Sequence, residues 1–456
     1  MTPLRTHLTE IFAAGLDRVN PYTMITRSVR LEGEVLKIDM GVKTMEENLG
    51  TYDRIFLLGA GKASARMALA FEEILGERIS KGLICVKYGH TEALSHAEVV
   101  ESDHPVPDEN GVKAARRLAE LADEADEKTL VITCISGGGS ALTPSPLCVE
   151  TPDGTACITL ADKQETTRLL LASGAAIEEI NCVRKHISNL KGGRFLARLH
   201  PARSLTFILS DVIGDDLGSI ASGMTHFDSS TFAEALAILR RRGVLEQVPK
   251  NVRNALNLGL EGKIPETVNP GDPTLALTTN LLIGTNRQAL LAAADKARDL
   301  GYTVSPITAR LCGEARHAAK TIADIARDTA TSDMFTPKPA CLIFGGETVV
   351  TLTGTGKGGR NQEIALAFLD DMKGWDDEKM KVAFLAASTD GNDGPTDAAG
   401  AFADAEILQK ATAFNLSTQA ALNANDAYTF FDTLNALHKT GPTNTNVCDL
   451  QIVLIT

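Results

Sequence analysis

This sequence of 456 residues has no CxxC motif, no long apolar run and no excess of positive charge. None of the eight cysteines forms a CxxC pair, and no run of cysteine and histidine has the spacing of a zinc site. Cys85, Cys134 and Cys341 lie inside apolar runs, where a thiol behaves as a small hydrophobic group. We therefore expect reduced, buried cysteines in a reducing compartment.

Membrane spans and nucleic-acid-binding surfaces are also not indicated. No window approaches the roughly 18 apolar residues that a span needs, and the first residues, MTPLRTHLTEIFAAGL, lack the apolar core of a signal peptide. A formal net charge of −13 disfavours nucleic acid as a partner, because its binding needs a basic surface. A local basic pocket for a small anion stays compatible with this charge. We expect a cytoplasmic protein that acts on small molecules.

Short apolar runs alternate with glycine-rich turns and helical segments along the chain. Strands are predicted at residues 54–59, 82–87, 130–135 and 205–209. The alternation indicates βαβ units, and hence an α/β fold with a mostly parallel sheet. Because ligands bind at the carboxyl ends of such strands, we expect several glycine-rich loops to meet at one edge.

The segment of residues 262–273 is the predicted linker, since it has three prolines, two glycines and no apolar periodicity. It divides the chain into an N-terminal domain of residues 1–265 and a C-terminal domain of residues 275–456. In the second domain we predict a helix at 286–300, a hairpin of residues 341–344 and 348–352, a helix from 362 and a strand at 382–387.

Apolar residues at positions 177, 180, 183, 187 and 190 have helical spacing and predict one helix over this segment. Arg184, Ser188 and Lys191 then share a second face. The predicted helix is therefore buried on one side and basic on the other.

The loop GAGKAS at residues 59–64 follows a predicted strand and opens a predicted helix. The N–H groups at a helix start can bind an anion. The loop is not a Walker A motif, because alanine follows Lys62, and serine occupies the third glycine position of the dinucleotide fingerprint. An anion-binding loop and a tight turn with a solvated lysine both stay open.

The stretch SGGGS at residues 136–140 places three glycines between two serines after a predicted strand. Successive backbone amides in such a loop form a nest for phosphate oxygens, which we favour over a flexible turn. The candidate phosphate-binding residues of the two loops are Gly59, Gly61, Ser136, Gly137, Gly138, Gly139 and Ser140.

Acidic residues follow several other predicted strands. Asp211 lies in SDVIGDD, Glu347 in GGE and Asp390 in STDGNDGPTD. Carboxylates beside phosphate loops suit Mg²⁺ binding or removal of a proton from an alcohol. Arg360, in GKGGRNQE, stands at a predicted helix start, where it can bind phosphate or carboxylate oxygens through two N–H groups. His104 is interpreted as a turn or packing residue, with a place in the substrate pocket as the less favoured alternative.

In combination these motifs resemble the glycerate 2-kinases whose C-terminal half is a MOFRL domain. Ten matching stretches follow one another along most of the chain, which is far more specific than any single loop. They are GAGKA, HPVPDENG, SGGGSAL, LADKQETTRLLLASGA, INCVRKHISNLKGGR, SDVIGDDLGSIASG, FGGETVV, GKGGRNQEIAL, STDGNDGPTDAAGA and GPTNTNVCDLQI.

The resemblance implies phosphorylation of D-glycerate at its 2-hydroxyl group with ATP and Mg²⁺, giving 2-phosphoglycerate and ADP. It implies a Rossmann- or flavodoxin-like three-layer N-terminal domain with a parallel sheet and a smaller C-terminal α/β domain with a mixed sheet. It also implies an active site in the cleft between the domains. The motif positions that match the family's cleft residues are Lys62, Arg360, Asp211, Glu347, Asp390 and Asn446.

On this hypothesis Lys62 and Arg360 are catalytic and compensate the charge of the transferring phosphoryl group. Asp211 accepts the proton of the 2-hydroxyl group. Glycerate is bound through Arg184 or Lys191, which would hold its carboxylate, and through Asn446. Mg²⁺ is held with help from Glu347 or Asp390.

Two other interpretations are weighed beside the kinase. One is an NAD(P)-dependent hydroxypyruvate reductase, a name that relatives of this family have carried. The other is a non-catalytic sugar-acid sensor, which would not need the lysine, the arginine and the acidic loops together. The oligomeric state stays open, a homodimer included.

Overall fold

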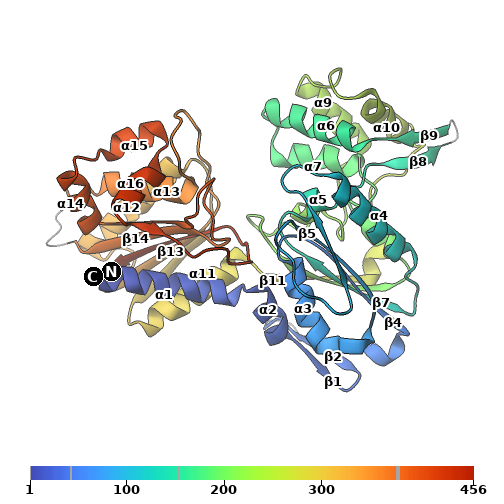
Figure 1. Cartoon of the computed structure of the whole chain (residues 1–456), viewed down its shortest axis with the longest axis horizontal. Helices are drawn as coiled ribbons and strands as arrows, with labels where there is room; N and C mark the ends of the chain where they lie inside the picture. Colours follow the sequence, from blue (N-terminus) through green and yellow to red (C-terminus); the bar gives the residue numbers. More distant parts are fainter. Residues whose placement is uncertain (1, 42–43, 152–153, 376–379) are drawn as a thin grey trace. The chain divides into compact units, whose positions relative to one another are not determined.

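The computed structural model describes residues 2–41, 44–151, 154–375 and 380–456, and the chain forms two compact units (Figure 1). The N-terminal unit comprises Pro21–Ser210 and Asp215–Ile283. The C-terminal unit comprises Met1–Asn20, Asp211–Gly214 and Gly284–Thr456. The domain ranges of 1–265 and 275–456 stay a prediction beside these discontinuous units.

The N-terminal unit is built on a six-stranded sheet in which the pairs β10–β7, β7–β4, β4–β5 and β5–β6 are parallel. The order of the strands across it is β11 (Thr278–Gly284), β10 (Arg203–Leu209), β7 (Thr129–Ile135), β4 (Arg54–Ala60), β5 (Ile79–Lys87) and β6 (Glu98–Ser102). Every residue of β7 is buried, as expected of an apolar strand covered on both faces.

Helices cover both faces of this sheet. Phe56 and Val131 pack with helices α4 (Glu109–Asp123) and α8 (Arg194–Leu199) on one face. Phe207 points to the other face, where its ring lies 4.7 Å from that of Phe71 in α3 (Ser64–Leu75). The result is the three-layer arrangement with a parallel sheet that the sequence predicted. The unit begins with α2 (Pro21–Ser28) and a small antiparallel sheet of β1 (Val29–Glu32), β2 (Val35–Asp39) and β3 (Thr44–Asn48).

A second hydrophobic core of this unit lies in a helical lobe (Figure 1). Leu170, Val183, Phe232 and Leu256 are fully buried in it. Each comes from a different helix. All four helices have one apolar stripe, and these stripes pack against one another. The lobe consists of α6 (Leu160–Ala172), α7 (Ile177–His186), α9 (Phe232–Arg241), α10 (Lys250–Leu260) and the hairpin of β8 (Cys148–Thr151) and β9 (Gly154–Cys157).

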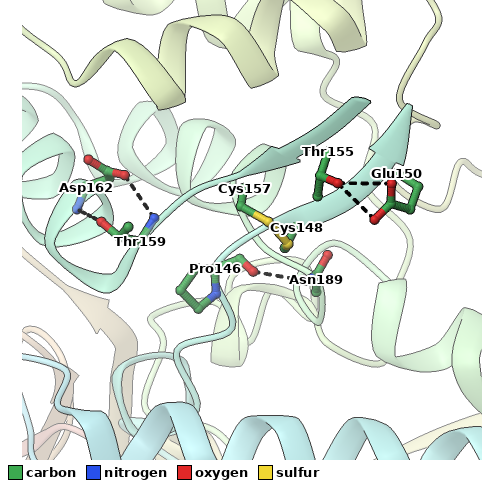
Figure 2. Close-up of a disulfide and its surroundings, with 8 residues drawn as sticks. All are labelled: Pro146, Cys148, Glu150, Thr155, Cys157, Thr159, Asp162 and Asn189. Carbon is green, nitrogen blue, oxygen red and sulfur yellow. Dashed lines mark hydrogen bonds between the residues drawn. A yellow bond between two sulfur atoms is a disulfide. The ribbon is translucent and has the colours of Figure 1, made fainter. Parts of the chain in front are cut away.

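A disulfide joins Cys148 to Cys157 across this hairpin (Figure 2). The two residues are direct partners in the antiparallel ladder, which brings their side chains together. The base of the hairpin is fixed by Asn189, whose Nδ2 donates to the carbonyl of Pro146 over 2.9 Å. The expectation of reduced cysteines is wrong for this pair, because no strands were predicted at residues 148–157.

The expectation is confirmed for the cysteines of the apolar runs. Cys85, Cys134 and Cys341 are free, buried thiols on strands β5, β7 and β13 (Ala340–Gly346). Burial raises the pKa of Cys85 to about 11, so its thiolate is scarce at neutral pH. Among the described residues, no helix combines the length and apolar character that crossing a membrane requires.

The C-terminal unit contains a second six-stranded sheet, which is mixed. Its order is β12 (Thr303–Leu311), β13, β17 (Asp449–Ile455), β14 (Val382–Ser388), β15 (Gly400–Asp404) and β16 (Leu437–His438). Among the strand pairings of the described residues in this sheet, only β12–β13 is parallel, and the others are antiparallel. The prediction of a C-terminal α/β fold with a mixed sheet is confirmed.

Figure 1 shows the helices of this unit on both faces of its sheet. Helices α1 (Pro3–Arg18) and α11 (Asn286–Asp299) cover one face, and α12 (Ala315–Ser332) and α13 (Arg360–Asp371) cover the other. Three shorter helices complete the unit: α14 (Ala405–Ala413), α15 (Thr418–Ala424) and α16 (Ala427–Thr433).

Two sequence-based predictions of local structure are wrong. The helix predicted over 177–190 ends at His186, because Ser188 forms a β-bridge with Pro146 and Asn189 donates its N–H to Ser145. The predicted hairpin does not form, because both edges of β13 are occupied by β12 and β17. Val349 instead makes an isolated parallel bridge to Glu314.

Helix α1 is fixed to the C-terminal unit by a buried ion pair. Arg5 donates from Nε and Nη2 to the carboxylate of Asp404, over 2.6 and 2.8 Å. Asp404 also accepts a hydrogen bond from the N–H of Ile407 at the start of α14. The same helix buries Leu8 and Phe12 completely.

Arg5→Ala is expected to lower the free energy of unfolding by about 3 kcal/mol, because it leaves the Asp404 carboxylate buried without its partner. Arg327→Ala, which truncates an exposed arginine on α12, should change it by less than about 0.5 kcal/mol. Urea denaturation followed by circular dichroism measures both values. Equal stabilities of the two variants would contradict the prediction.

Candidate active site

The two predicted phosphate loops lie together, because β4 and β7 are adjacent parallel strands that end at the same edge. The N–H of Lys62 donates to the carbonyl of Gly137 over 2.9 Å. Ser136 is buried, and its Oγ accepts a hydrogen bond from the N–H of Ala63 over 3.0 Å. Ser136 therefore holds the start of α3 in place, and its hydroxyl oxygen is already engaged.

Two glycines make this close contact possible. Gly61 has a φ of +146°, and a Cβ on it would stand 2.1 Å from the Oγ of Ser136. Gly138 has a φ of +85°, and a Cβ there would stand 3.0 Å from Cδ2 of His104 and 3.6 Å from Cε of Lys62. Only glycine adopts these angles without strain. The Lys62 side chain and His104 thus lie beside the SGGGS loop.

A cavity of about 820 Å³ opens beside this loop, within the N-terminal unit. One end of it is formed by His104, Gly138, Ser140, Lys163, Arg184 and Lys191. We call this cavity the cationic pocket. Four predicted residues from two separate stretches of the sequence therefore share one cavity: Gly138, Ser140, Arg184 and Lys191.

The basic side chains of the cationic pocket are held by uncharged groups. Arg184 donates from Nη2 to the Oγ of Ser140 over 2.6 Å, and Lys191 donates from Nζ to the Ser140 carbonyl over 2.7 Å. Lys163 donates to the carbonyl of Ile187 over 2.9 Å. In the described part of the chain, neither these three cations nor Lys62 forms an ion pair. The charge of the pocket is therefore not compensated by the protein.

Burial and repulsion between like charges lower the pKa values of the basic side chains in the cationic pocket. Burial, with Arg184 and Arg194 nearby, lowers the pKa of Lys163 to about 7. Burial, with Arg184 and Lys163 nearby, also lowers the pKa of Lys191 well below its usual value. His104 has its pKa lowered to about 4 by burial and then by Lys62, so its imidazole is neutral at neutral pH. A bound anion would relieve this repulsion.

A second cluster lies in the C-terminal unit and centres on Arg360. Its Nε and Nη2 donate to the two oxygens of Asp449 over 2.6 and 2.9 Å, and its Nη1 lies 2.9 Å from Oε1 of Glu347. Asp449 is completely buried, and the two carboxylates raise the pKa of the guanidinium. We call these three residues the arginine–carboxylate cluster. Arg360 is therefore already paired with acids, unlike Lys62.

The other predicted residues of this unit have local partners. Asp390 accepts hydrogen bonds at Oδ1 from the Ser388 hydroxyl and from the N–H of Asn392. The Oδ1 of Asn446 accepts the N–H of Cys448 over 3.0 Å. The Cys448 thiol donates to the carbonyl of Asp211 over 3.2 Å, and its Sγ lies 3.8 Å from Oε2 of Glu347. Cys448 thus links the Asp211 segment to the arginine–carboxylate cluster.

The donor set of this region fits a partly protein-bound Mg²⁺. Among the described residues, no group of three or more histidine, cysteine or acidic side chains could hold a metal ion. Mg²⁺ at kinase sites usually needs only one or two carboxylates, because phosphates and waters complete its shell. Glu347 is half-buried, and burial raises the pKa of its carboxyl group, a rise that Arg360 opposes. Glu347 and Asp390 are both compatible with such a role.

Sequence reasoning missed two residues of these clusters. Lys163 lies in the stretch LADKQETTRLLLASGA, which contributes only to the family resemblance, and the tertiary fold buries it. Asp449 begins the last apolar run, and an acid at the head of a buried strand is itself a signal that a cationic partner exists.

Two family models match this chain, and known proteins resemble it over most of its length. The model of a domain of unknown function, DUF4147, matches residues 7–257, and that of the MOFRL family matches residues 340–449. A D-glycerate 2-kinase of Thermotoga maritima is 42% identical over 404 residues, covering 88% of this chain and 91% of that protein. This chain belongs to the glycerate 2-kinase family with a C-terminal MOFRL domain.

Further proteins are similar to this member of the glycerate 2-kinase family. A glycerate 2-kinase of Pyrococcus horikoshii is 38% identical, covering 97% of this chain and 95% of that protein. The crystal structure of a glycerate kinase from Thermotoga maritima superimposes with a TM-score of 0.85 at 38% identity, covering 99% of both chains. A protein of Agrobacterium vitis that is 38% identical carries the name putative hydroxypyruvate reductase.

Proposed function

We propose that this chain phosphorylates D-glycerate at its 2-hydroxyl group with ATP, giving 2-phosphoglycerate and ADP. The observation that carries the proposal is the cationic pocket, where the buried Lys163 and Lys191 and the half-buried Arg184, all without acidic partners, lie beside the SGGGS loop. Such a site favours an anion with several charged oxygens, as a triphosphate has. The activity named for the family's curated members supports the same reaction.

The residue roles follow from the chemistry of phosphoryl transfer, which relies on positioning and on charge compensation. Lys62 and Arg360 are proposed to stabilise the charge of the transferring group, and Asp211 to accept the proton of the 2-hydroxyl group. The amides of residues 137–139 would bind phosphate oxygens. A bound Mg²⁺ would neutralise part of the ATP charge, with Glu347 or Asp390 supplying a carboxylate oxygen.

Glycerate itself is proposed to be held by Asn446 and by one basic group of the cationic pocket. Arg184 suits a carboxylate better than Lys191, because its half-buried guanidinium offers several N–H donors. Lys191 is only 1% exposed and already donates to the Ser140 carbonyl.

A coupled assay tests the reaction. The protein is incubated with D-glycerate, ATP and Mg²⁺, and enolase without a mutase reports 2-phosphoglycerate. A signal that requires mutase would indicate the 3-phosphate instead and contradict the proposal. Oxidation of NADPH or NADH with hydroxypyruvate, without phosphoryl transfer, would identify a reductase.

Binding of ATP is expected to take up a proton at about pH 8, because Lys163, with a pKa of about 7, is then largely neutral. The negative triphosphate favours the ammonium form, so affinity should fall as the pH rises from about 7 to about 9. Isothermal titration calorimetry in two buffers of different ionisation enthalpy measures the uptake. Lys163→Met should reduce the uptake without abolishing it, because the pKa of Lys191 is also lowered. An unchanged uptake in that variant would contradict the assignment.

The same lysine affects stability without ligand. Its pKa is lowered in the folded protein from 10.5 to about 7, so the unfolded chain binds more protons between these values. The contribution of Lys163 to the free energy of unfolding should therefore fall as the pH is lowered through this range.

A further inference from the structure

The cationic pocket is much larger than its charged end requires. Its volume of about 820 Å³ is in the range that accommodates a drug-sized ligand. A three-carbon acid such as glycerate would leave most of it empty. The part beyond the charged end therefore suits a larger ligand.

Helices α6 and α7 each line the pocket with both basic and apolar side chains. Lys163 and Leu171 both line it from α6, eight residues apart, which is about 12 Å along a helix. Arg184 and Ile177 line it from α7, seven residues apart, or about 10 Å. On each helix a buried or half-buried basic residue thus lines the cavity two turns from an exposed apolar one. On α6 the ion-paired Glu165 and Arg168 also line it between them.

The apolar end exposes side chains that a ligand would cover. Leu171 is 62% exposed and Ile177 56%, and both line this cavity. Val106, which is 59% exposed, lines the cavity nearer the charged end, because the carbonyl of Pro107 accepts a hydrogen bond from Gln164, the neighbour of Lys163. Exposed apolar side chains that gather at a cavity mark a binding surface, because covering them is favourable.

We infer that the apolar end of the cationic pocket, at Leu171 and Ile177, binds the base and ribose of the phosphoryl donor. This inference rests on the proposed function, because the charged end then holds the phosphates of the same nucleotide. A nucleotide matches the pocket in both respects: its phosphates are anionic, and its base is flat and mainly apolar. The charged end would hold the phosphates, and the apolar end, which lies apart from it, would hold the base.

The test compares ATP with inorganic triphosphate, which lacks the base and the ribose. In the full-length variant Leu171→Ser/Ile177→Ser, the dissociation constant for ATP should rise about tenfold or more, because apolar contacts with the base are lost. The dissociation constant for triphosphate and the KM for glycerate should change by less than about twofold, because the charged end is untouched. Both side chains are exposed, so the variant should fold normally.

Leu260→Ser is the matched control, since this leucine is 51% exposed on α10 of the same unit and does not line the pocket. It should bind ATP like the original protein. An unchanged ATP affinity in the double variant would overturn the inference, as would an equal loss of triphosphate affinity. A higher KM for glycerate with unchanged ATP binding would assign the apolar end to the acceptor instead.

The outcomes separate this inference from the proposed function. If the protein forms 2-phosphoglycerate but the double variant binds ATP normally, the inference fails and the function stands. If ATP binds through Leu171 and Ile177 but no 2-phosphoglycerate forms, the function fails and the nucleotide site stands. If the original protein binds no ATP, both are wrong.

Discussion

Lys62→Ala is expected to lower kcat for 2-phosphoglycerate formation by about 10²- to 10³-fold, the loss typical of removing one group that stabilises transition-state charge. Lys62 lies two residues before α3, beside the SGGGS loop, and this half-buried residue has no ion pair among the described residues. Its removal therefore leaves no carboxylate unpaired, and the unfolding midpoint should stay unchanged. The coupled enolase assay and thermal denaturation measure the two quantities.

Lys81→Ala is the control for Lys62→Ala. Lys81 lies on β5 of the same sheet and forms an exposed ion pair with Glu124, of a kind that contributes less than about 1 kcal/mol. It should retain normal turnover. Near-normal turnover in Lys62→Ala would remove this lysine from the chemistry, whatever the control shows.

Arg360→Ala is expected to abolish activity and also to lower the free energy of unfolding by about 3 kcal/mol, because it leaves Asp449 buried without a partner. Arg360 differs from Lys62 in this respect, since Asp449 is 0% exposed and accepts two hydrogen bonds from the guanidinium. Activity alone would therefore not separate a chemical role from a structural one. Urea denaturation of the same variant measures the structural part.

Arg360→Met/Asp449→Leu separates the two roles. Replacing both partners of a buried ion pair by apolar residues is often neutral for stability, so this variant should unfold close to the original midpoint. It should remain inactive if the guanidinium acts on the phosphoryl group. A stable, fully active double variant would show that Arg360 only neutralises Asp449. If Lys62 and Arg360 act on the same transition state, their combined loss should be smaller than the product of the separate losses.

The sequence predicts the loops of the site well because their signals are local. Strands β4 and β7 are continuous apolar runs, and each is followed directly by glycines whose backbone angles other residues do not adopt. The rule that parallel strands present their carboxyl ends at one edge then brings GAGKAS and SGGGS together. Neither step needs a long-range contact to be known in advance.

The sequence fails where a tertiary contact overrides the local pattern. The apolar spacing through Leu190 predicts a continuous helix. It ends at His186, because the Ile187 carbonyl accepts the N–H of residue 147 and Asn189 donates to the carbonyls of residues 145 and 146. Lys191 consequently reaches the Ser140 carbonyl from a turn, and the predicted basic helix face does not exist. Arg184 and Lys191 still share the pocket, for a reason other than helical periodicity.

The acidic residues show the same limit. Asp211, Glu347 and Asp390 attract attention because they lie in conspicuous polar loops, whereas Asp449 is hidden at the start of an apolar run. Its importance follows only from its contact with Arg360, 89 residues away in sequence. A local sequence motif cannot indicate a partner at that separation.

The attachment of α1 to the C-terminal unit has a consequence for synthesis of the protein. The partners of this helix, among them Asp404 and strand β17, are made near the end of the chain. Residues 21–283 supply nearly all of the N-terminal unit, so that unit can assemble while translation continues. Leu8 and Phe12 lack their native cover until those partners are made, so α1 docks after the N-terminal unit has been synthesised. A fusion placed directly before α1 would therefore affect a late step of folding rather than an early one.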